Sequence, residues 1–114
     1  MSKRDITLLL GDMLQSAQKI QRYTKDLDFT SFVSDDKTKD AVVRNFEIIG
    51  EAANRIDNNF RAEHQNIEWN RIRGFRNRIV HNYFGIDYEI VWEIIDTYLD
   101  DLIVKLNNMI KQNT

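Results

Sequence analysis

The sequence predicts an all-α protein, an up-down antiparallel four-helix bundle, from three observations. Its 114 residues include no proline and only four glycines, which disfavours a turn-rich β architecture and favours long helices. Apolar residues recur at intervals of three and four along four separate stretches, which is the spacing of one helix face. The connections between these stretches are short, so consecutive helices are expected to lie side by side in opposite directions.

Length and composition predict a single domain over residues 1–114 that is soluble and cytoplasmic. The chain has no signal-type apolar run and no stretch long enough to span a membrane, so no membrane partner is expected. It contains no cysteine, which excludes disulfides and thiolate metal sites. The net charge of −2 argues against a general nucleic-acid coat protein but allows a local basic site.

The first two helices are predicted from a cap and an apolar stripe each. Ser2 is the expected cap of a helix that runs to about Lys25, and Asp26 to Asp36 form a connection. The second helix starts at the acidic pair 35–36, where carboxylates favour the positive end of the helix dipole. The two stripes consist of Ile6, Leu9, Leu10, Met13, Ala17, Ile20 and Tyr23, and of Val42, Phe46, Ile49, Ala53 and Ile56.

The second helix has an apolar arc that is wider than one core contact requires, because Ala41, Val43, Gly50 and Ala52 flank its stripe. Gly50 with Ala53 would let another helix approach closely. Two interpretations are open: a well-buried core helix, or a helix that gives part of its arc to a homodimer surface.

The third and fourth predicted helices meet at Gly85 and Asp87, where glycine ends one helix and the aspartate caps the next. The third begins near residues 67–69 and carries the stripe Ile72, Phe75, Ile79 and Tyr83. The fourth carries Tyr88, Val91, Ile95, Tyr98, Leu102, Leu106 and Met109. His64, which precedes the third helix among polar residues, is interpreted as an ordinary surface side chain.

The third helix concentrates the residues that could perform chemistry. Four arginines lie within eight positions, followed by one of only two histidines and by a tyrosine: Arg71, Arg73, Arg76, Arg78, His81 and Tyr83. Guanidinium groups bind phosphodiesters and stabilise developing charge, and histidine exchanges protons near neutral pH. If the 2′-hydroxyl is the nucleophile, one proton acceptor, one donor and a cationic clamp are sufficient in principle to cleave RNA without a metal ion.

The spacing of Arg76 and His81 raises a geometric difficulty. On an ideal helix, residues five apart are separated by roughly 140° and about 7.5 Å, so the two side chains diverge. His81 would then point the same way as Arg73 and Asn77. Either the helix is distorted or ends near His81, or the two side chains meet across a dimer interface, which would also supply two histidines.

Structural explanations exist for each of these features. A single histidine near a helix end is more often structural than catalytic, an arginine-rich helix face is usually solvated, and Tyr83 in line with the stripe is more often a core tyrosine. Glu47 and Glu51 lie four residues apart in the second helix and could suggest an acidic pair. An exposed helix face is enough to explain these two carboxylates.

Four segments carry a resemblance to a known family, and one of them, residues 83–87 followed by Val91 and Trp92, resembles the family's entry to the last helix. Residues 76–83 (RNRIVHNY) resemble the Arg-x4-His-x-Tyr motif of HepT-like (DUF86) proteins, a branch of the HEPN superfamily. Residues 41–52 (AVVRNFEIIGEA) look like the family's second-helix signature, and residues 69–77 (WNRIRGFRN) resemble the stretch that leads into the motif. The sequence departs from the family where it has Glu68 instead of proline and Phe75 instead of leucine.

The resemblance implies an all-α homodimer in which both motifs face one cleft, and a metal-independent endoribonuclease that is the toxin of a type VII-like toxin–antitoxin pair. Carried over to this chain, Arg76 and His81 are the catalytic pair, and no cofactor or metal is expected. Arg73, Asn77 and Arg78 are the candidate contacts to the RNA substrate, which could be tRNA or mRNA.

The resemblance also implies a partner, a minimal nucleotidyltransferase (MNT) that acts as the antitoxin and transfers AMP from ATP to Tyr83. A phosphodiester there would compete with the RNA backbone. Two other hypotheses stay open: a non-catalytic subunit that docks such a nucleotidyltransferase and serves as its substrate, and a purely structural dimer. The structural dimer leaves the arginine cluster unexplained.

Overall fold

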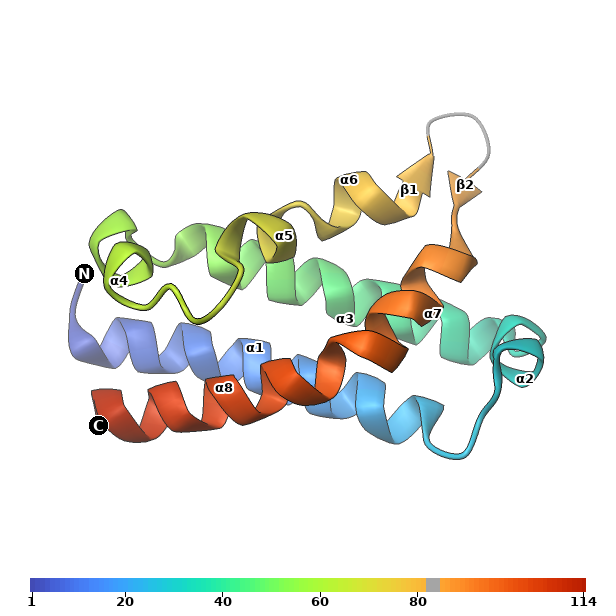
Figure 1. Cartoon of the computed structure of the whole chain (residues 1–114), viewed down its shortest axis with the longest axis horizontal. Helices are drawn as coiled ribbons and strands as arrows, with labels where there is room; N and C mark the ends of the chain where they lie inside the picture. Colours follow the sequence, from blue (N-terminus) through green and yellow to red (C-terminus); the bar gives the residue numbers. More distant parts are fainter. Residues whose placement is uncertain (82–84) are drawn as a thin grey trace.

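The computed structural model describes residues 1–81 and 85–114, with only the backbone of His81, and the predicted all-α class is confirmed within these residues (Figure 1). The regular structure that is not helical is one pair of two-residue strands. The helices are α1 (Lys3–Thr24), α2 (Phe29–Val33), α3 (Asp36–Arg55), α4 (Asn58–Glu63), α5 (Trp69–Arg73), α6 (Phe75–Ile79), α7 (Tyr88–Thr97) and α8 (Leu99–Asn113). The strands are β1 (Val80–His81) and β2 (Gly85–Ile86).

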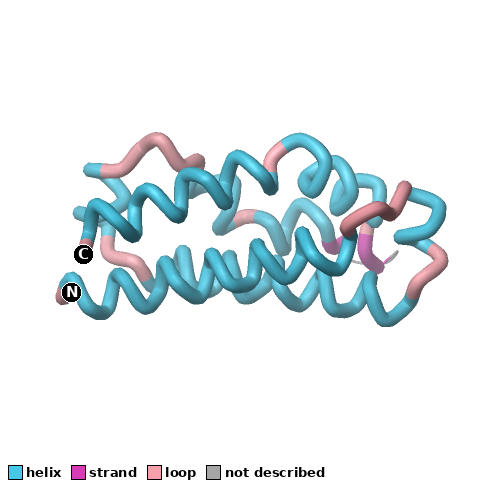
Figure 2. Tube along the Cα trace, turned by 90° about the horizontal axis from the view of Figure 1, so that it is seen from below, coloured by secondary structure: helices cyan, strands magenta, loops and turns pink. Residues whose placement is uncertain are grey.

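The helix α1 packs lengthwise against both α3 and α8, and the molecule as a whole is elongated, with principal-axis extents of 42 × 30 × 20 Å. The short helices α5 and α6 lie along α3, whereas α2 and the start of α7 meet at the opposite end from the termini (Figures 1 and 2). The two termini lie together, because the side-chain amide of Asn113 donates to the Lys3 carbonyl and to the Thr7 hydroxyl. Within the described part of the chain, no helix is long and apolar enough to cross a membrane.

Side-chain caps hold the starts of α1 and α7, as predicted for Ser2 and Asp87, and also that of α3, whereas within the described residues α5, α6 and α8 have no such cap. Each cap accepts a hydrogen bond from a backbone N–H two or three residues later, which satisfies a donor that the helix itself leaves unpaired. The donor–acceptor distances are 3.0 Å from Asp5 to Ser2 and 3.1 Å from Glu89 to Asp87. Asp35 caps α3 in the same way at 3.1 Å.

The wide apolar arc of α3 is covered within the chain itself. One side of α3 packs against α1, and the other side packs against α5 and α6. The α5 backbone approaches α3 closely at Gly50, because a Cβ atom there would lie 3.3 Å from the backbone oxygen of Ile72. Phe46 and Phe75 meet edge to face nearby, with ring centroids 5.3 Å apart. The pattern therefore fits the core-helix interpretation, and it gives no separate support for a dimer surface.

The prediction of one continuous third helix was wrong. The chain leaves the helix at Gly74 and again after Ile79, where Val80 adopts an extended backbone (φ −104°, ψ 120°). Val80 and His81 pair with Ile86 and Gly85 in antiparallel β1–β2, and Gly85 has a positive φ of 76°, which glycine adopts at little steric cost. The helix that carries Arg76 thus ends before His81. This is one of the two arrangements expected from the sequence, because Arg76 and His81 would diverge on a continuous helix.

The fourth predicted helix is also divided, at Tyr98 between α7 and α8. The Tyr98 ring is buried beside Phe75, and the guanidinium carbon of Arg71 lies 4.6 Å from the ring centroid. Arg71 also pairs with the Glu68 carboxylate at 3.1 Å. These contacts tie α5 to the junction of α7 and α8.

His64 is not the plain surface side chain that the sequence suggested. It is half-buried, and its ring stacks on Phe60 with centroids 4.0 Å apart. Its Nδ1 atom lies 2.9 Å from the Phe60 carbonyl oxygen, and its own carbonyl accepts from Trp69 Nε1 at 2.9 Å. His64 therefore has a structural role in the turn that leads into α5.

The close approach at Gly50 predicts a position-specific effect on stability. Gly50→Leu should lower the free energy of unfolding by about 1–3 kcal/mol, because the side chain collides with the α5 backbone. Gly11→Leu is the matched control, since a Cβ there meets nothing within 4 Å. Urea denaturation followed by circular dichroism would measure both variants, and equal destabilisation would contradict this packing.

The burial of Tyr98 predicts that the free energy of unfolding decreases at alkaline pH. Burial, assisted by the Glu68 carboxylate, raises the pKa of Tyr98 to about 12, while the Glu68 backbone amide and Arg71 oppose this shift. Because the folded pKa lies above the ordinary value of 10, the stabilisation is complete below pH 10 and is lost as the pH rises toward 12. Tyr98→Phe should remove about 2 kcal/mol of this pH dependence. The free energy of unfolding of wild type and Tyr98→Phe would be measured by denaturation at pH 8 and pH 11.5. An equal decrease in both proteins would contradict a role for Tyr98.

Candidate functional site

A small pocket lies between α3 and the segment that forms α5 and α6, with a volume of about 250 Å³. This is smaller than the pockets of roughly 300–1,000 Å³ that hold drug-sized ligands, so it suits a fragment such as a sugar phosphate. Its lining residues are Phe46, Glu47, Gly50, Glu51 and Asn54 from α3, with Arg73, Arg76 and Asn77 from the opposite wall.

Three of the predicted site residues come together here: Arg73, Arg76 and Asn77. Arg76 and Asn77 follow Arg73 by three and four residues, so all three share one face of a helix. The interruption at Gly74 does not disturb this arrangement, and all three residues line one pocket. All three residues are exposed, so their polar groups are accessible to a ligand.

Arg73 is held in position by Asn54. Its Nε–H donates to the side-chain oxygen of Asn54 at 2.6 Å, across from α5 to α3. An arginine bound through Nε keeps its two terminal nitrogens for a bidentate contact, which is the geometry that phosphate oxygens accept. Among the described residues, no hydrogen bond or ion pair occupies the guanidinium of Arg76.

The field at this pocket includes a third arginine. The guanidinium of Arg61 donates to the carbonyls of Ala53 and Ile56 and to the side chain of Asn58, so it secures the end of α3. Burial and the nearby charge of Arg73 both lower the pKa of Arg61. The effect of the Arg73 charge on Arg61 indicates that the two guanidinium groups lie near one another at this end of α3.

The other predicted site residues are placed less completely. The backbone of His81 follows α6 directly in β1, and its side chain and Tyr83 lie outside the described residues. Arg78 is half-buried and is not among the described residues that line the pocket. The positions of Arg73, Arg76 and Asn77 are therefore described, whereas the roles of His81 and Tyr83 remain predictions.

Sequence reasoning missed the contribution of α3 to this pocket. The sequence predicted that Glu47 and Glu51 lie on an exposed helix face, and it gave no reason to select Asn54. In the structure all three line the pocket that contains Arg76. Glu47 lies 3.6 Å from the guanidinium of Arg44, one turn away on the same helix. The signal in the sequence was the spacing of residues 47, 51 and 54, which marks one face of a helix but does not say what that face meets.

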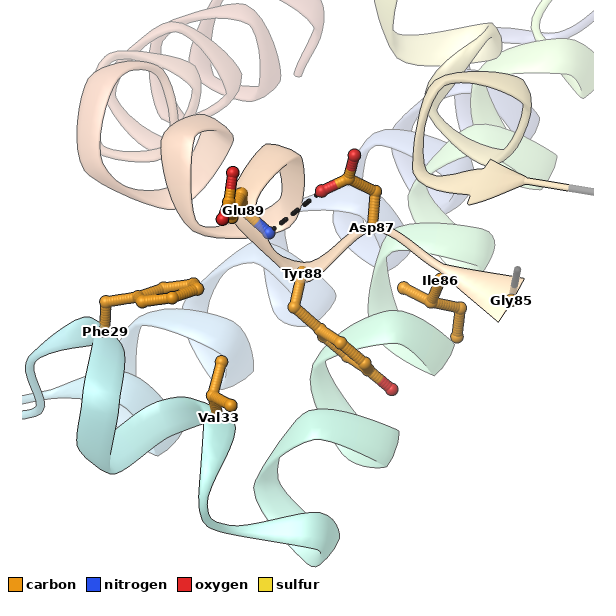
Figure 3. Close-up of a pocket in the computed structure, with 7 residues that line it drawn as sticks. All are labelled: Phe29, Val33, Gly85, Ile86, Asp87, Tyr88 and Glu89. Carbon is orange, nitrogen blue, oxygen red and sulfur yellow. Dashed lines mark hydrogen bonds between the residues drawn. The ribbon is translucent and has the colours of Figure 1, made fainter.

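A second, more open hollow of about 530 Å³ lies between α2 and the start of α7 (Figure 3). Phe29 and Val33 line it from α2, and Ile86 and Tyr88 line it from the facing segment. The Asp87 carboxylate accepts from the backbone amides that it caps, and no basic residue is among the described lining residues. This hollow is therefore poorly suited to an oxyanion, in contrast to the pocket at Arg76.

The pocket at Arg76 brings groups of both charges together. Two guanidinium groups, two side-chain amides and two carboxylates line its space of about 250 Å³, and guanidinium groups are the side chains whose geometry matches phosphate oxygens. The fold and this pocket together define an all-α protein with a candidate phosphodiester site.

Comparisons with known proteins place this chain in a family. Residues 13–109 match the family model described as Ribonuclease HepT-like. The chain is 44% identical over 95 residues to "Putative RNase MJ1380" of Methanocaldococcus jannaschii, which covers 83% of this chain and 87% of that protein. It is 33% identical over 109 residues to "Probable ribonuclease HepT" of Thermococcus cleftensis, covering 96% and 99%. No solved structure matches it. The chain belongs to the Ribonuclease HepT-like family.

The pocket predicts specific binding of oxyanions. Inorganic phosphate should shift the amide resonances of Arg73, Arg76 and Asn77 more than those of other residues in a ¹⁵N-correlated NMR titration. Arg76→Ala should weaken this binding about tenfold, since a hydrogen bond to a charged group contributes about 1.5–3 kcal/mol. Arg22→Ala, an exposed arginine on α1, should leave it unchanged. Equal weakening by both variants would indicate only a general effect of charge.

Proposed function

We propose that this chain is a metal-independent endoribonuclease, the toxin of a type VII-like HEPN/MNT toxin–antitoxin pair in the cytoplasm. Residues 1–114 would form one HEPN/HepT-like domain, an up-down antiparallel bundle that acts as a homodimer. The family membership and the ribonuclease names of the relatives support an RNA substrate, such as tRNA or mRNA. The observation that carries the proposal is that Arg76 shares one pocket with Arg73 and Asn77.

In this proposal the substrate's own 2′-hydroxyl attacks the adjacent phosphate. Arg76 binds the phosphate and stabilises the charge that builds on its oxygens, and His81 transfers a proton. Arg73, oriented by Asn54, and Asn77 hold the same phosphate, while Arg78 contacts the RNA backbone beside the pocket. The products would be a 2′,3′-cyclic phosphate and a 5′-hydroxyl.

The homodimer enters the proposal for a chemical reason as well as by family resemblance. Cleavage requires a proton acceptor and a proton donor, and the motif holds one histidine per chain. Two copies facing one cleft would bring two histidines to the RNA. The nucleotidyltransferase antitoxin would silence the site by placing AMP on Tyr83, because the added phosphodiester would compete with the RNA backbone for the arginines.

The test is cleavage of a labelled tRNA by the purified protein in EDTA. Wild type should cleave it, and Arg76→Ala and His81→Ala should each lose at least 100-fold in rate, because each removes a group that stabilises the transition state. Circular dichroism would show that both variants remain folded. Arg22→Ala, far from the site in the sequence, serves as the charge-matched control.

Absence of cleavage by wild type on several RNAs would contradict the ribonuclease and favour the non-catalytic docking subunit. Mass spectrometry of Tyr83 must accompany that result, since bound AMP would itself silence the enzyme. In the docking case, binding to the nucleotidyltransferase should persist in His81→Ala.

A further inference from the structure

A carboxylate in the arginine pocket is unusual for a site whose proposed ligand is a phosphodiester. Two negative side chains, Glu47 and Glu51, line the same 250 Å³ space as Arg73 and Arg76. If the pocket served only to bind phosphate, these charges would weaken it by repulsion. Their presence calls for a chemical use or for neutralisation by a neighbour.

The two carboxylates differ in what surrounds them. Glu47 is half-buried, and Arg44 lies 3.6 Å from it on the same helix, so its charge is partly balanced. Glu51 is exposed, and among the described residues no hydrogen bond or ion pair occupies its carboxylate. Glu51 is therefore the accessible proton acceptor of the pocket.

We propose that Glu51 is the general base of the cleavage reaction, a role that rests on the proposed ribonuclease function. The Glu51 carboxylate removes the proton from the 2′-hydroxyl as the bond between O2′ and phosphorus forms. The bond between phosphorus and O5′ breaks at the same phosphorus, and His81 donates the proton that O5′ receives. The protonated Glu51 and the neutral His81 then exchange protons with water, so no metal or co-reactant is required.

This assignment changes what the dimer must supply. With Glu51 as acceptor and His81 as donor, each chain holds both proton-transfer groups, and a second histidine is not needed for the chemistry. Arg76 on the facing wall would hold the phosphate whose neighbouring hydroxyl Glu51 deprotonates. Gly50 precedes Glu51 and brings α3 against the α5 backbone, which fixes the distance between the two walls.

The pH dependence of cleavage distinguishes a mechanism with Glu51 as base and His81 as acid from one that uses two histidines. A glutamate base and a histidine acid give a rate that falls on the acidic side as a carboxylate is protonated and on the alkaline side as an imidazolium is lost. Two histidines would place both limbs in the range of imidazole. The charged groups that face Glu51 in the pocket are Glu47, Arg73 and Arg76, and Arg55 lies one turn further along α3.

The experiment compares Glu51→Gln with Glu47→Gln and Glu93→Gln in tRNA cleavage from pH 4 to pH 9, in EDTA. Glu51→Gln should lower kcat about 100-fold or more and remove the acidic limb, with an unchanged circular dichroism melt because the residue is exposed. Glu47→Gln should lower KM by reducing repulsion and should keep the acidic limb. Glu93→Gln, exposed on α7, should behave as wild type.

Two outcomes would overturn the assignment while leaving the ribonuclease intact. One is a Glu51→Gln variant that retains kcat within threefold, and the other is loss of the acidic limb in Glu47→Gln instead. Either result would coexist with RNA cleavage that depends on Arg76 and His81, so failure of the base and failure of the proposed function are distinguishable. Activity that requires added Mg²⁺ would also overturn it, by assigning the pocket carboxylates to a metal ion.

Discussion

The close packing of α3 against the α5 backbone is the contact on which the rest of this structure depends. Gly50 lets the two segments approach to a distance that a side chain would strain, and the Phe46–Phe75 pair fills the space beside it. This packing creates a pocket with acidic and amide groups on one wall and arginines on the other. The same contact explains why α3 is apolar over so wide an arc without a second subunit.

The end of α6 is the interruption that matters most for the site. Arg76 and Asn77 follow Arg73 by three and four residues, so the three share one helix face with or without the interruption at Gly74. The end of α6 at Ile79, in contrast, puts the backbone of His81 into an extended strand. The pocket thus combines the long helix α3 on one wall with the short helices α5 and α6 on the other.

The sequence was sufficient for the helical class, for the caps at Ser2 and Asp87 and for the buried positions Ile72, Phe75 and Ile79, because each depends on neighbouring residues alone. The break at Gly74 was not predictable in this way, since one glycine disfavours a helix by only about 1 kcal/mol and the apolar stripe continues through it. The role of Glu51 and Asn54 depends on which helix α3 meets. That information is tertiary, and helical spacing does not contain it.

In the proposed reaction the RNA supplies its own nucleophile, in a pocket lined by two arginines and two carboxylates. The most direct measurement compares cleavage of an RNA oligonucleotide with that of the same oligonucleotide carrying a single 2′-deoxy residue at the cut position. The account predicts 2′,3′-cyclic phosphate ends from the first substrate and no cleavage at that position in the second. Cleavage at the deoxy position, or products with 3′-hydroxyl ends, would contradict the account, because water and not the 2′-hydroxyl would then be the nucleophile.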